Sequence, residues 1–141
     1  MKRIISISVI IFMLIGFSCK KEIAIIPPEP VKTINGSWKI VKALRNGTDL
    51  TARFDFSAFR INFTNSDYTI ENMVPFIVSQ NGKWSFDDPQ YPFKISFVTQ
   101  SGLNKSSDML YPVVKGVRNI VISFSPGCTL NNYQYTLEKA N

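Results

Sequence analysis

The chain has 141 residues, of which 45% are hydrophobic and 13% aromatic, and it carries 16 Lys and Arg against 10 Asp and Glu. It contains no histidine, which excludes Ser-His-Asp and Cys-His nucleophile pairs and zinc sites built on histidine. The cations are scattered along the chain rather than clustered, and this argues against a nucleic-acid partner.

The N-terminus has the pattern of an export signal. Lys2 and Arg3 precede an uncharged, mostly apolar run over residues 4–17, which matches the charged and hydrophobic regions of such a signal. The run is 14 residues long, shorter than the ~20 residues of a transmembrane helix. The sequence therefore predicts a signal peptide over residues 1–18 that is removed on export.

The motif Gly16-Phe17-Ser18-Cys19 resembles the lipobox that precedes an acylated cysteine. The resemblance implies that Cys19 is lipidated and that the protein is anchored in the cell envelope, at the outer membrane. The alternative is ordinary secretory cleavage, because Gly16 and Ser18 also form a small-x-small site. In that case the protein is released and Cys19 is free to pair with Cys128.

Lipidation of Cys19 leaves Cys128 without an intramolecular partner. Because a lone thiol is a liability in an oxidising compartment, we expect Cys128 to be buried beneath the turn Ser125-Pro126-Gly127-Cys128. Loss of residues 1–18 leaves 14 basic against ten acidic side chains and a formal charge of +4.

Residues 19–33 form the second segment. Pro27, Pro28 and Pro30 lie here among short aliphatic and charged residues, a composition that predicts an extended tether. Residues 34–141 are then long enough for one domain that folds without disulfides.

Within that domain the apolar residues recur with a period of two, as in half-buried strands. Phe59, Ile61 and Phe63 share one face of the clearest example. Asn-Gly, Ser-Gly and Lys-Gly pairs and Asp-rich turns separate such runs. We expect eight strands, at residues 37–44, 59–64, 68–72, 82–86, 93–97, 109–114, 119–124 and 133–137.

Eight sequential antiparallel strands predict an all-β fold. Closure into an up-and-down barrel removes the exposed edges and leaves room for side chains or one small ligand. A β-sandwich is the alternative. Between the first two strands, Asp49 is placed to cap a single helical turn over residues 49–56.

Three motifs carry a family resemblance. Gly36-Ser37-Trp38 begins the first strand as the G-x-W motif begins lipocalins, Asn46-Gly47-Thr48-Asp49 follows, and Gly82-Lys83-Trp84 precedes Tyr91-Pro92. This order resembles a lipocalin-like family of Bacteroidetes lipoproteins classed as a domain of unknown function, over nearly all of residues 34–141. The resemblance implies that Trp38 closes one end of the barrel. Lipocalins pack a late-strand arginine over this tryptophan, where the present chain has Lys139.

Aromatic side chains are the main candidates for a binding site. If the barrel holds an apolar small molecule, we expect Trp38, Phe63, Trp84, Phe97 and Phe124 to line the pocket, but the usual role of such rings is to fill the interior. Tyr91, Tyr111 and Tyr133 are alternatives for stacking on sugar rings.

Acidic residues offer weaker candidates. Asp87 and Asp88 are adjacent, as in some calcium and acid–base sites, but adjacent strand residues point to opposite faces and Pro89 favours a turn. The sequence thus predicts a non-enzymatic protein with no metal site and no cofactor.

Two functions remain open. The first is a lipocalin-like binding module for a small apolar ligand or glycan fragment, anchored to the membrane through Cys19. The second is an accessory lipoprotein with a filled barrel that engages a protein partner in the envelope.

Overall fold

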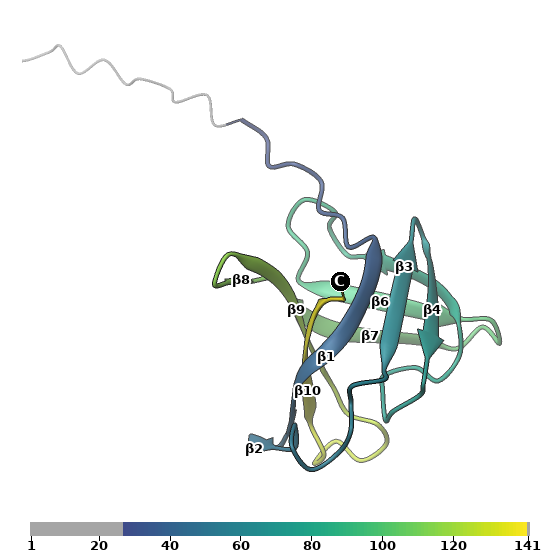
Figure 1. Cartoon of the computed structure of the whole chain (residues 1–141). Helices are drawn as coiled ribbons and strands as arrows, with labels where there is room; N and C mark the ends of the chain where they lie inside the picture. The colour runs from purple at the N-terminus through teal and green to yellow at the C-terminus, as the bar shows by residue number, and fades with distance from the viewer. Residues whose placement is uncertain (1–26, 141) are drawn as a thin grey trace, which may run out of the picture.

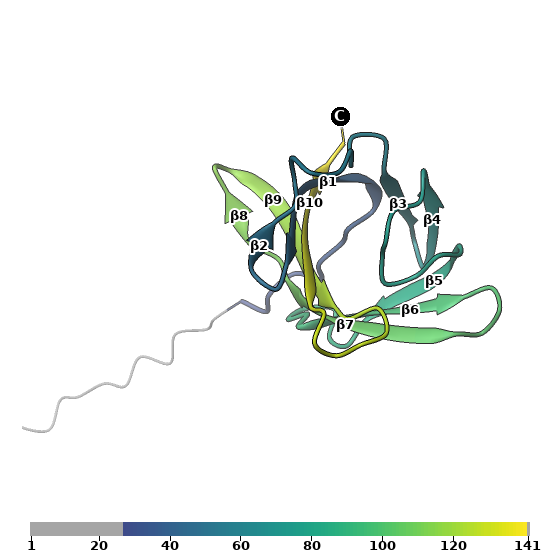
Figure 2. The same ribbon diagram turned by 90° about the horizontal axis from the view of Figure 1, so that it is seen from below.

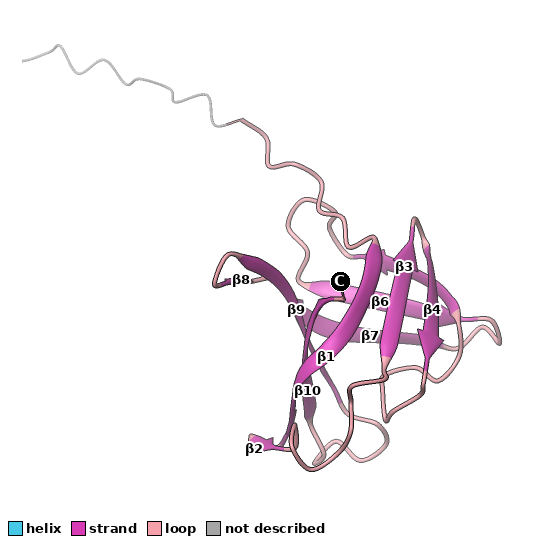
Figure 3. Ribbon diagram, viewed as in Figure 1, coloured by secondary structure: helices cyan, strands magenta, loops and turns pink. Residues whose placement is uncertain are grey.

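The computed structural model describes residues 27–140 (Figure 1). The predicted signal peptide, Cys19 and the first part of the tether lie outside the described residues. Within the described part there are strands, turns and loops and no helix (Figure 3). The strands are β1 (Gly36–Arg45), β2 (Thr48–Asp49), β3 (Arg60–Thr64), β4 (Asp67–Glu71), β5 (Gly82–Phe86), β6 (Lys94–Thr99), β7 (Asn104–Leu110), β8 (Val113–Val114), β9 (Val117–Phe124) and β10 (Tyr133–Lys139).

Eight of these strands form a closed antiparallel barrel. The order is β10-β1-β3-β4-β5-β6-β7-β9, and a further pairing of β10 with β9 completes the ring, which Figure 2 shows from below. The short strands β2 and β8 pair outside the ring with β1 and β9. The predicted eight-stranded up-and-down barrel is confirmed, and the sandwich alternative is wrong, because each strand of the ring has a neighbour on both sides.

Seven of the eight predicted strands lie within two residues of their observed ends. The strand predicted over residues 109–114 is misplaced, because β7 covers Asn104–Leu110 and ends before Pro112. Pro112 has no amide proton to donate to a ladder, and the polar start of β7, from Asn104 to Ser107, has no apolar alternation to reveal it. The chain resumes as the short β8 after the break.

Turn chemistry behaves as predicted at the hairpins. Asn46 (φ 49°) and Gly47 (φ 80°) connect β1 to β2, and Lys115 (φ 51°) and Gly116 (φ 80°) connect β8 to β9. Two consecutive residues with positive φ are the two-residue turn that matches the twist of antiparallel strands.

The segment after β2 differs in part from the expected helical turn. Asp49 is in a capping position, since its Oδ1 accepts a hydrogen bond from the Thr51 amide at 2.8 Å. The Phe54 amide also bonds the Leu50 carbonyl oxygen at 3.3 Å. The chain then turns away, so the predicted helical turn is reduced to hydrogen-bonded turns.

A bulge in β1 changes which of its side chains face the interior. The pairing with β10 shifts register between Ile40 and Lys42. Trp38 and Ile40 point inward before the bulge, whereas Ala43 points inward after it. Because a bulge inserts one unpaired residue, it moves the odd-numbered positions to the inside and brings Arg45 to the end of the barrel.

The closed end of the barrel, where the tether enters β1, is sealed by Trp38. Its side chain is completely buried, and its Nε1 donates to the Ile34 carbonyl oxygen at 2.7 Å. The Lys139 Nζ lies 5.9 Å from the centre of the Trp38 ring. Gly36 has φ 119°, a conformation that side-chain-bearing residues rarely adopt, and lies against Lys139.

Aromatic rings fill the interior between the two ends. Phe97 lies in contact with Phe63, Tyr68 and Phe76, with ring centres 6.4, 5.1 and 6.2 Å away. Phe76 comes from the loop over residues 72–81, which we call the plug loop, and its side chain is only 8% exposed. The barrel is therefore packed along its axis rather than open.

Cys128 corrects another expectation. Its thiol is free and exposed in the loop between β9 and β10 rather than buried beneath a turn. Gly127 (φ 95°) turns the chain there, and the residues around it, 125–130, are all exposed. The loop projects into solvent and does not pack on the core, so it cannot bury the thiol.

Candidate functional site

The candidate site is an apolar pocket of about 260 Å³ at the end of the barrel opposite Trp38. We call it the mouth pocket. It lies where β1 ends and β10 begins, between the plug loop and the segment over residues 50–56. Its lining comprises Arg45 of β1, Tyr133 and Tyr135 of β10, Met73, Val74 and Pro75 of the plug loop, and Leu50, Phe54, Asp55 and Phe56 of the segment after β2.

Two tyrosines of β10 form the floor of the mouth pocket. Tyr133 stacks on Phe124 with ring centres 5.8 Å apart, and Tyr135 meets Phe124 edge-on at 5.3 Å. Period-two alternation directs both tyrosines inward. The floor is thus continuous with the packed interior and is held rigid by it.

Tyr135 also fixes the plug loop. Its Oη donates a hydrogen bond to the Pro75 carbonyl oxygen at 2.7 Å. Burial, with a smaller contribution from Tyr133, raises the pKa of Tyr135 to about 12. The phenol therefore stays neutral and remains a donor over the whole physiological range.

Besides accepting the hydrogen bond from Tyr135, the plug loop is held by contacts of its own side chains. Phe76 stacks on Tyr135 with ring centres 6.2 Å apart and contacts Phe59 at 5.2 Å. Val78 is also buried, and the Asn72 side chain donates to the Ala58 carbonyl oxygen at 3.0 Å. These contacts position Met73, Val74 and Pro75 as one wall of the pocket.

The rim of the pocket combines exposed apolar side chains with two opposite charges. Phe54 and Met73 are 64% and 68% exposed. Arg45 Nη2 donates to Asn131 Oδ1 at 2.7 Å, and the guanidinium carbon lies 5.8 Å from the centre of the Tyr133 ring. Hydrogen bonds from the Ser57 hydroxyl and amide hold the pKa of Asp55 below its usual value.

The rim arrangement sets the chemistry that the pocket can offer. A guanidinium has five N–H donors, so the bond to Asn131 leaves donors on Arg45 for another acceptor. The walls are apolar. The pocket is therefore suited to a small apolar group that carries an acceptor at its outer end.

A second concavity lies on the outer surface where β4 and β5 separate. These strands share only two paired positions, Asp67 with Lys83 and Tyr68 with Gly82. The resulting open groove, of about 520 Å³, has a mixed lining that includes Asn81, Val98 and Gln100. Because it is shallow and open to solvent, it encloses a small molecule less well than the mouth pocket does.

The five aromatic residues predicted to line a pocket are inside the barrel but do not form one site. Trp38 seals the closed end. Phe63 contacts Trp84 and Phe97, with ring centres 5.2 and 6.4 Å away, whereas Phe124 belongs to the cluster below the mouth. None of the five lines the mouth pocket, and their role in ligand binding stays a prediction.

The three tyrosines proposed for sugar stacking are also separated. Tyr133 is at the mouth pocket. Tyr91 is 56% exposed in the loop between β5 and β6. Tyr111 lies beside the tether, where its Oη donates to the Thr33 carbonyl oxygen at 3.0 Å. They form no common platform.

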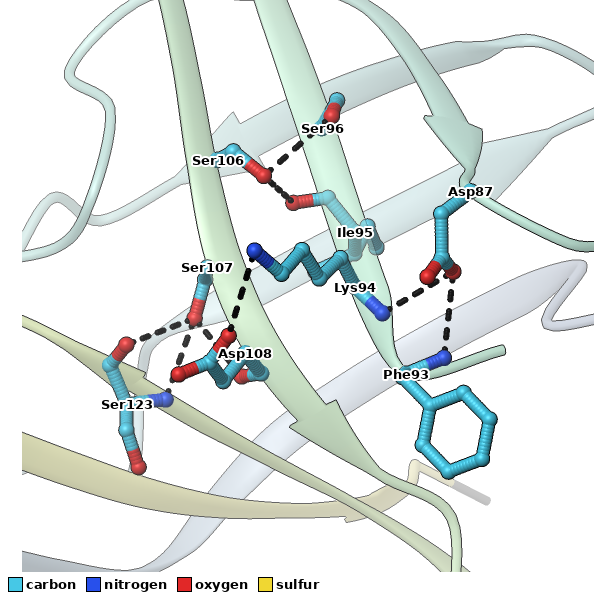
Figure 4. Close-up of polar contacts among 9 residues, drawn as sticks. All are labelled: Asp87, Phe93, Lys94, Ile95, Ser96, Ser106, Ser107, Asp108 and Ser123. Atoms are coloured by element: carbon cyan, nitrogen blue, oxygen red, sulfur yellow. Dashed lines mark hydrogen bonds and ion pairs between the residues drawn. The ribbon is translucent and has the colours of Figure 1, made fainter. Parts of the chain in front are cut away.

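Asp87 and Asp88 organise the turn after β5, as Pro89 suggested. Asp87 Oδ1 accepts hydrogen bonds from the amides of Phe93 and Lys94, both at 3.0 Å (Figure 4). The bond from the Lys94 amide is the main cause of a lowered pKa at Asp87. Asp88 Oδ1 accepts hydrogen bonds from the amides of Gln90 and Tyr91. Both carboxylates therefore stabilise the backbone of the turn.

Figure 4 also shows how neighbouring strands are joined near this turn. Lys94 Nζ lies 3.9 Å from Asp108 Oδ1. The Ser107 hydroxyl donates to the Ser123 carbonyl oxygen at 2.8 Å and accepts from the Ser123 amide at 3.1 Å, where β7 and β9 diverge. Across residues 27–140, no group of three His, Cys, Asp or Glu side chains is placed to hold a metal ion.

Sequence reasoning missed most of the mouth pocket. Tyr133 was a candidate, but Arg45 and Val74 were not, because neither belongs to a recognisable motif. The one available signal is Phe54-Asp55-Phe56, two aromatics in a segment with no strand alternation. Aromatic residues in a connecting segment either pack on the barrel or remain exposed. Phe56 is buried against the barrel, whereas Phe54 is exposed.

The fold and the site together define a class, a small closed antiparallel barrel with a packed interior and an apolar pocket at its mouth. The chain belongs to the family described as Domain of unknown function (DUF5004), which matches residues 16–138. No curated protein and no solved structure matches the chain. In the described residues no helix has the length and apolar character needed to cross a membrane.

Proposed function

We propose that the protein is a non-catalytic lipoprotein of the cell envelope that binds a small apolar ligand in the mouth pocket. The observation that carries the proposal is the pocket itself, an apolar concavity with two tyrosines as its floor and exposed Phe54 and Met73 at its rim. Large exposed apolar side chains around a concave site are typical of a ligand-binding surface.

The volume of the pocket limits the ligand. At about 260 Å³ it is slightly smaller than the ~300–1,000 Å³ of sites for drug-sized molecules. The ligand is therefore a small molecule, or one end of a longer chain whose remainder stays in solvent. The free donors of Arg45 favour a ligand with a carboxylate or another acceptor at that end.

Two observations support the lipocalin-like and lipoprotein parts of the proposal. Lys139 lies over the Trp38 ring, in the role that the resemblance gives to an arginine. The family match begins at Gly16, so the lipobox-like segment and Cys19 are inside it. The anchor at the outer membrane is part of the proposal, as is the absence of a catalytic role.

Binding is tested by calorimetric titration of the processed protein with decanoate, with decanol and with a chitin disaccharide. We expect decanoate to bind and Val74→Trp, which fills the pocket from the plug loop, to weaken binding at least tenfold. Phe54→Ser tests the rim, and Leu130→Ser is its matched control, since Leu130 is 81% exposed and lies outside the pocket.

The outcomes separate the possible ligands. Binding of decanoate but not decanol assigns a role to Arg45, and Arg45→Gln then removes the difference. Equal binding by the Val74→Trp variant, or binding of the disaccharide alone, contradicts the proposal. Lipidation is tested separately by the mass of the processed N-terminus, where an unacylated Cys19 contradicts the anchor.

A second candidate function is an accessory lipoprotein that binds a protein partner. The packed interior favours it, because Phe76 contacts Phe97 and Phe124 across the barrel and leaves the ligand only the mouth. Crosslinking in native envelopes tests this candidate. Recovery of one stable partner, together with no ligand binding, favours it over the first.

A further inference from the structure

The β8–β9 hairpin is an exposed apolar feature near the tether. We call residues 110–118 the tip hairpin. Its side chains Leu110, Val113, Val114 and Val117 are between 44% and 61% exposed. Figures 1 and 2 show β8 and the start of β9 extending beyond the barrel wall. An exposed apolar cluster of this kind is typical of an interaction surface.

Both faces of the tip hairpin carry apolar groups. Val114 pairs with Val117, and Val113 pairs with Arg118. Because successive strand residues point to opposite faces, Val114 and Val117 lie on one side while Val113 lies on the other. A ribbon with valines on both sides, and with Arg118 beside Val113 on one of them, is better suited to a charged lipid interface than to docking of one face in a protein groove.

The tip hairpin is joined to the tether. Tyr111, at its base, donates to the Thr33 carbonyl oxygen at 3.0 Å. The guanidinium of Arg118 lies 4.8 Å from the Tyr111 ring centre, and its Nη1 donates to the Tyr111 carbonyl oxygen at 2.8 Å. The hairpin therefore lies at the end of the barrel from which the chain runs back toward Cys19.

A second exposed apolar group lies at this end. The Lys32 amide donates to the Pro89 carbonyl oxygen at 2.7 Å, which fixes the β5–β6 loop beside the tether. Tyr91 and Phe93 of that loop are 56% and 68% exposed. Aromatic side chains are favoured at the boundary between lipid and water.

The charge of the tip hairpin also suits a lipid surface. Lys115 is at its turn and Arg118 is in β9, whereas residues 109–118 contain no acidic side chain. Anionic headgroups attract such cations by about 1 kcal/mol each. Thr33 follows Cys19 by 14 residues, a distance of at most ~50 Å along an extended chain, which would hold the hairpin at high local concentration near the membrane.

We propose that the tip hairpin inserts its valines into the headgroup region of an anionic membrane, with Lys115 and Arg118 contacting lipid phosphates. This proposal rests on the proposed lipid anchor at Cys19. It adds an orientation, since the tether end then faces the membrane and the mouth pocket, at the opposite end of β1, faces away from it.

The test uses the processed full-length protein reconstituted through its own anchor in vesicles of phosphatidylcholine, with or without phosphatidylglycerol. A polarity-sensitive dye is attached at Val114→Cys in a Cys128→Ser background. The matched control carries the dye at Leu130→Cys, an exposed position in the loop beside the mouth pocket. We expect a blue shift and quenching by headgroup-labelled lipids at position 114 only, larger with phosphatidylglycerol.

Lys115→Asn tests the charge without disturbing the turn, because Lys115 has φ 51° and Asn tolerates this conformation. Removing one cation lowers the inserted population about fivefold in anionic vesicles. Identical signals at positions 114 and 130 overturn the proposal. A blue shift that appears in native envelopes but not in protein-free vesicles also overturns it, in favour of a protein partner.

The mass of the processed N-terminus, measured on the same sample, separates this proposal from the anchor. If Cys19 is unacylated, the lipoprotein proposal fails, and flotation of the same protein with anionic vesicles decides the hairpin proposal. Flotation that Lys115→Asn weakens supports it, and absence of flotation overturns it.

Discussion

The two ends of the barrel are closed by different means. At the tether end, the Trp38 Nε1 bonds the carbonyl oxygen of Ile34, four residues earlier, while Lys139 of β10 lies over the ring. At the mouth, Tyr135 bonds Pro75, a residue 60 positions away, and a separate loop supplies Phe76. The first end thus contains a hydrogen bond between near neighbours in the chain, whereas the hydrogen bond at the second end joins residues that only the completed barrel brings together.

This difference explains where a ligand site can form. At the closed end, Trp38 is completely buried, and its hydrogen bond to the Ile34 carbonyl oxygen fixes the ring. The mouth is covered by two connecting segments that meet imperfectly and leave a pocket between them. Loops held by a rigid scaffold are where binding sites usually occur, so the mouth is the end that sequence change can adapt to a ligand.

The largest expected effect is at the closed end. Trp38→Ala removes a fully buried side chain, and such changes lower the free energy of unfolding by about 3–5 kcal/mol. Phe54→Ala at the mouth, where the ring is 64% exposed, is expected to change it by less than about 1 kcal/mol. Urea denaturation measures the free energy of unfolding of both variants. Equal decreases would contradict the difference between the two ends.

Alkaline pH is expected to weaken the barrel through two buried tyrosines. Burial raises the pKa values of Tyr68 and Tyr135 from 10.0 to about 12. Because the folded state holds these protons more tightly, their contribution is complete below pH 10 and is lost as the pH rises from about 10 to 12. The loss is about 2–3 kcal/mol for each tyrosine.

Denaturation midpoints measured between pH 8 and pH 12 test this, provided the protein refolds. The variants Tyr68→Phe and Tyr135→Phe should each flatten the decline. Stability that stays constant up to pH 12 would contradict the assignment.

A smaller effect compares the two phenols directly. Tyr135→Phe leaves the Pro75 carbonyl oxygen without its donor and is expected to lower the free energy of unfolding by about 1–2 kcal/mol. Tyr68 Oη has no hydrogen-bond partner among the described residues, so Tyr68→Phe should be neutral or stabilising. Hydrogen exchange in the plug loop should rise in the first variant alone, and a rise in both would refute the role of the Tyr135 bond.

The smallest effect concerns Lys139. Its ammonium lies over the Trp38 ring at 5.9 Å, and an exposed cation–π contact contributes about 0.5–1 kcal/mol. Lys139→Met should therefore lower the free energy of unfolding by that amount, whereas Lys105→Met, at an exposed lysine of β7, should not. An equal decrease in the free energy of unfolding for both variants would show that the contact between Lys139 and the Trp38 ring does not stabilise the fold.

Much of the barrel could be predicted from the sequence. Alternation such as that of Phe59, Ile61 and Phe63 reports the two faces of a strand, and pairs such as Asn46-Gly47 report the turns between strands, because both signals depend on neighbouring residues alone. The position of β7 could not be predicted in this way, because its polar first half is held by pairing with β6 rather than by its own composition.

The mouth pocket, by contrast, was decided by the tertiary structure. The bulge after Ile40 brings Arg45 to the mouth, the plug loop inserts Phe76 where no strand pattern marks it, and Cys128 stays exposed because its loop lies over no core. Periodicity assigns a side chain to one face of a strand. Which loop crosses the open end, and what space it leaves, depends on contacts between residues far apart in the chain, and these exist only once the barrel has closed.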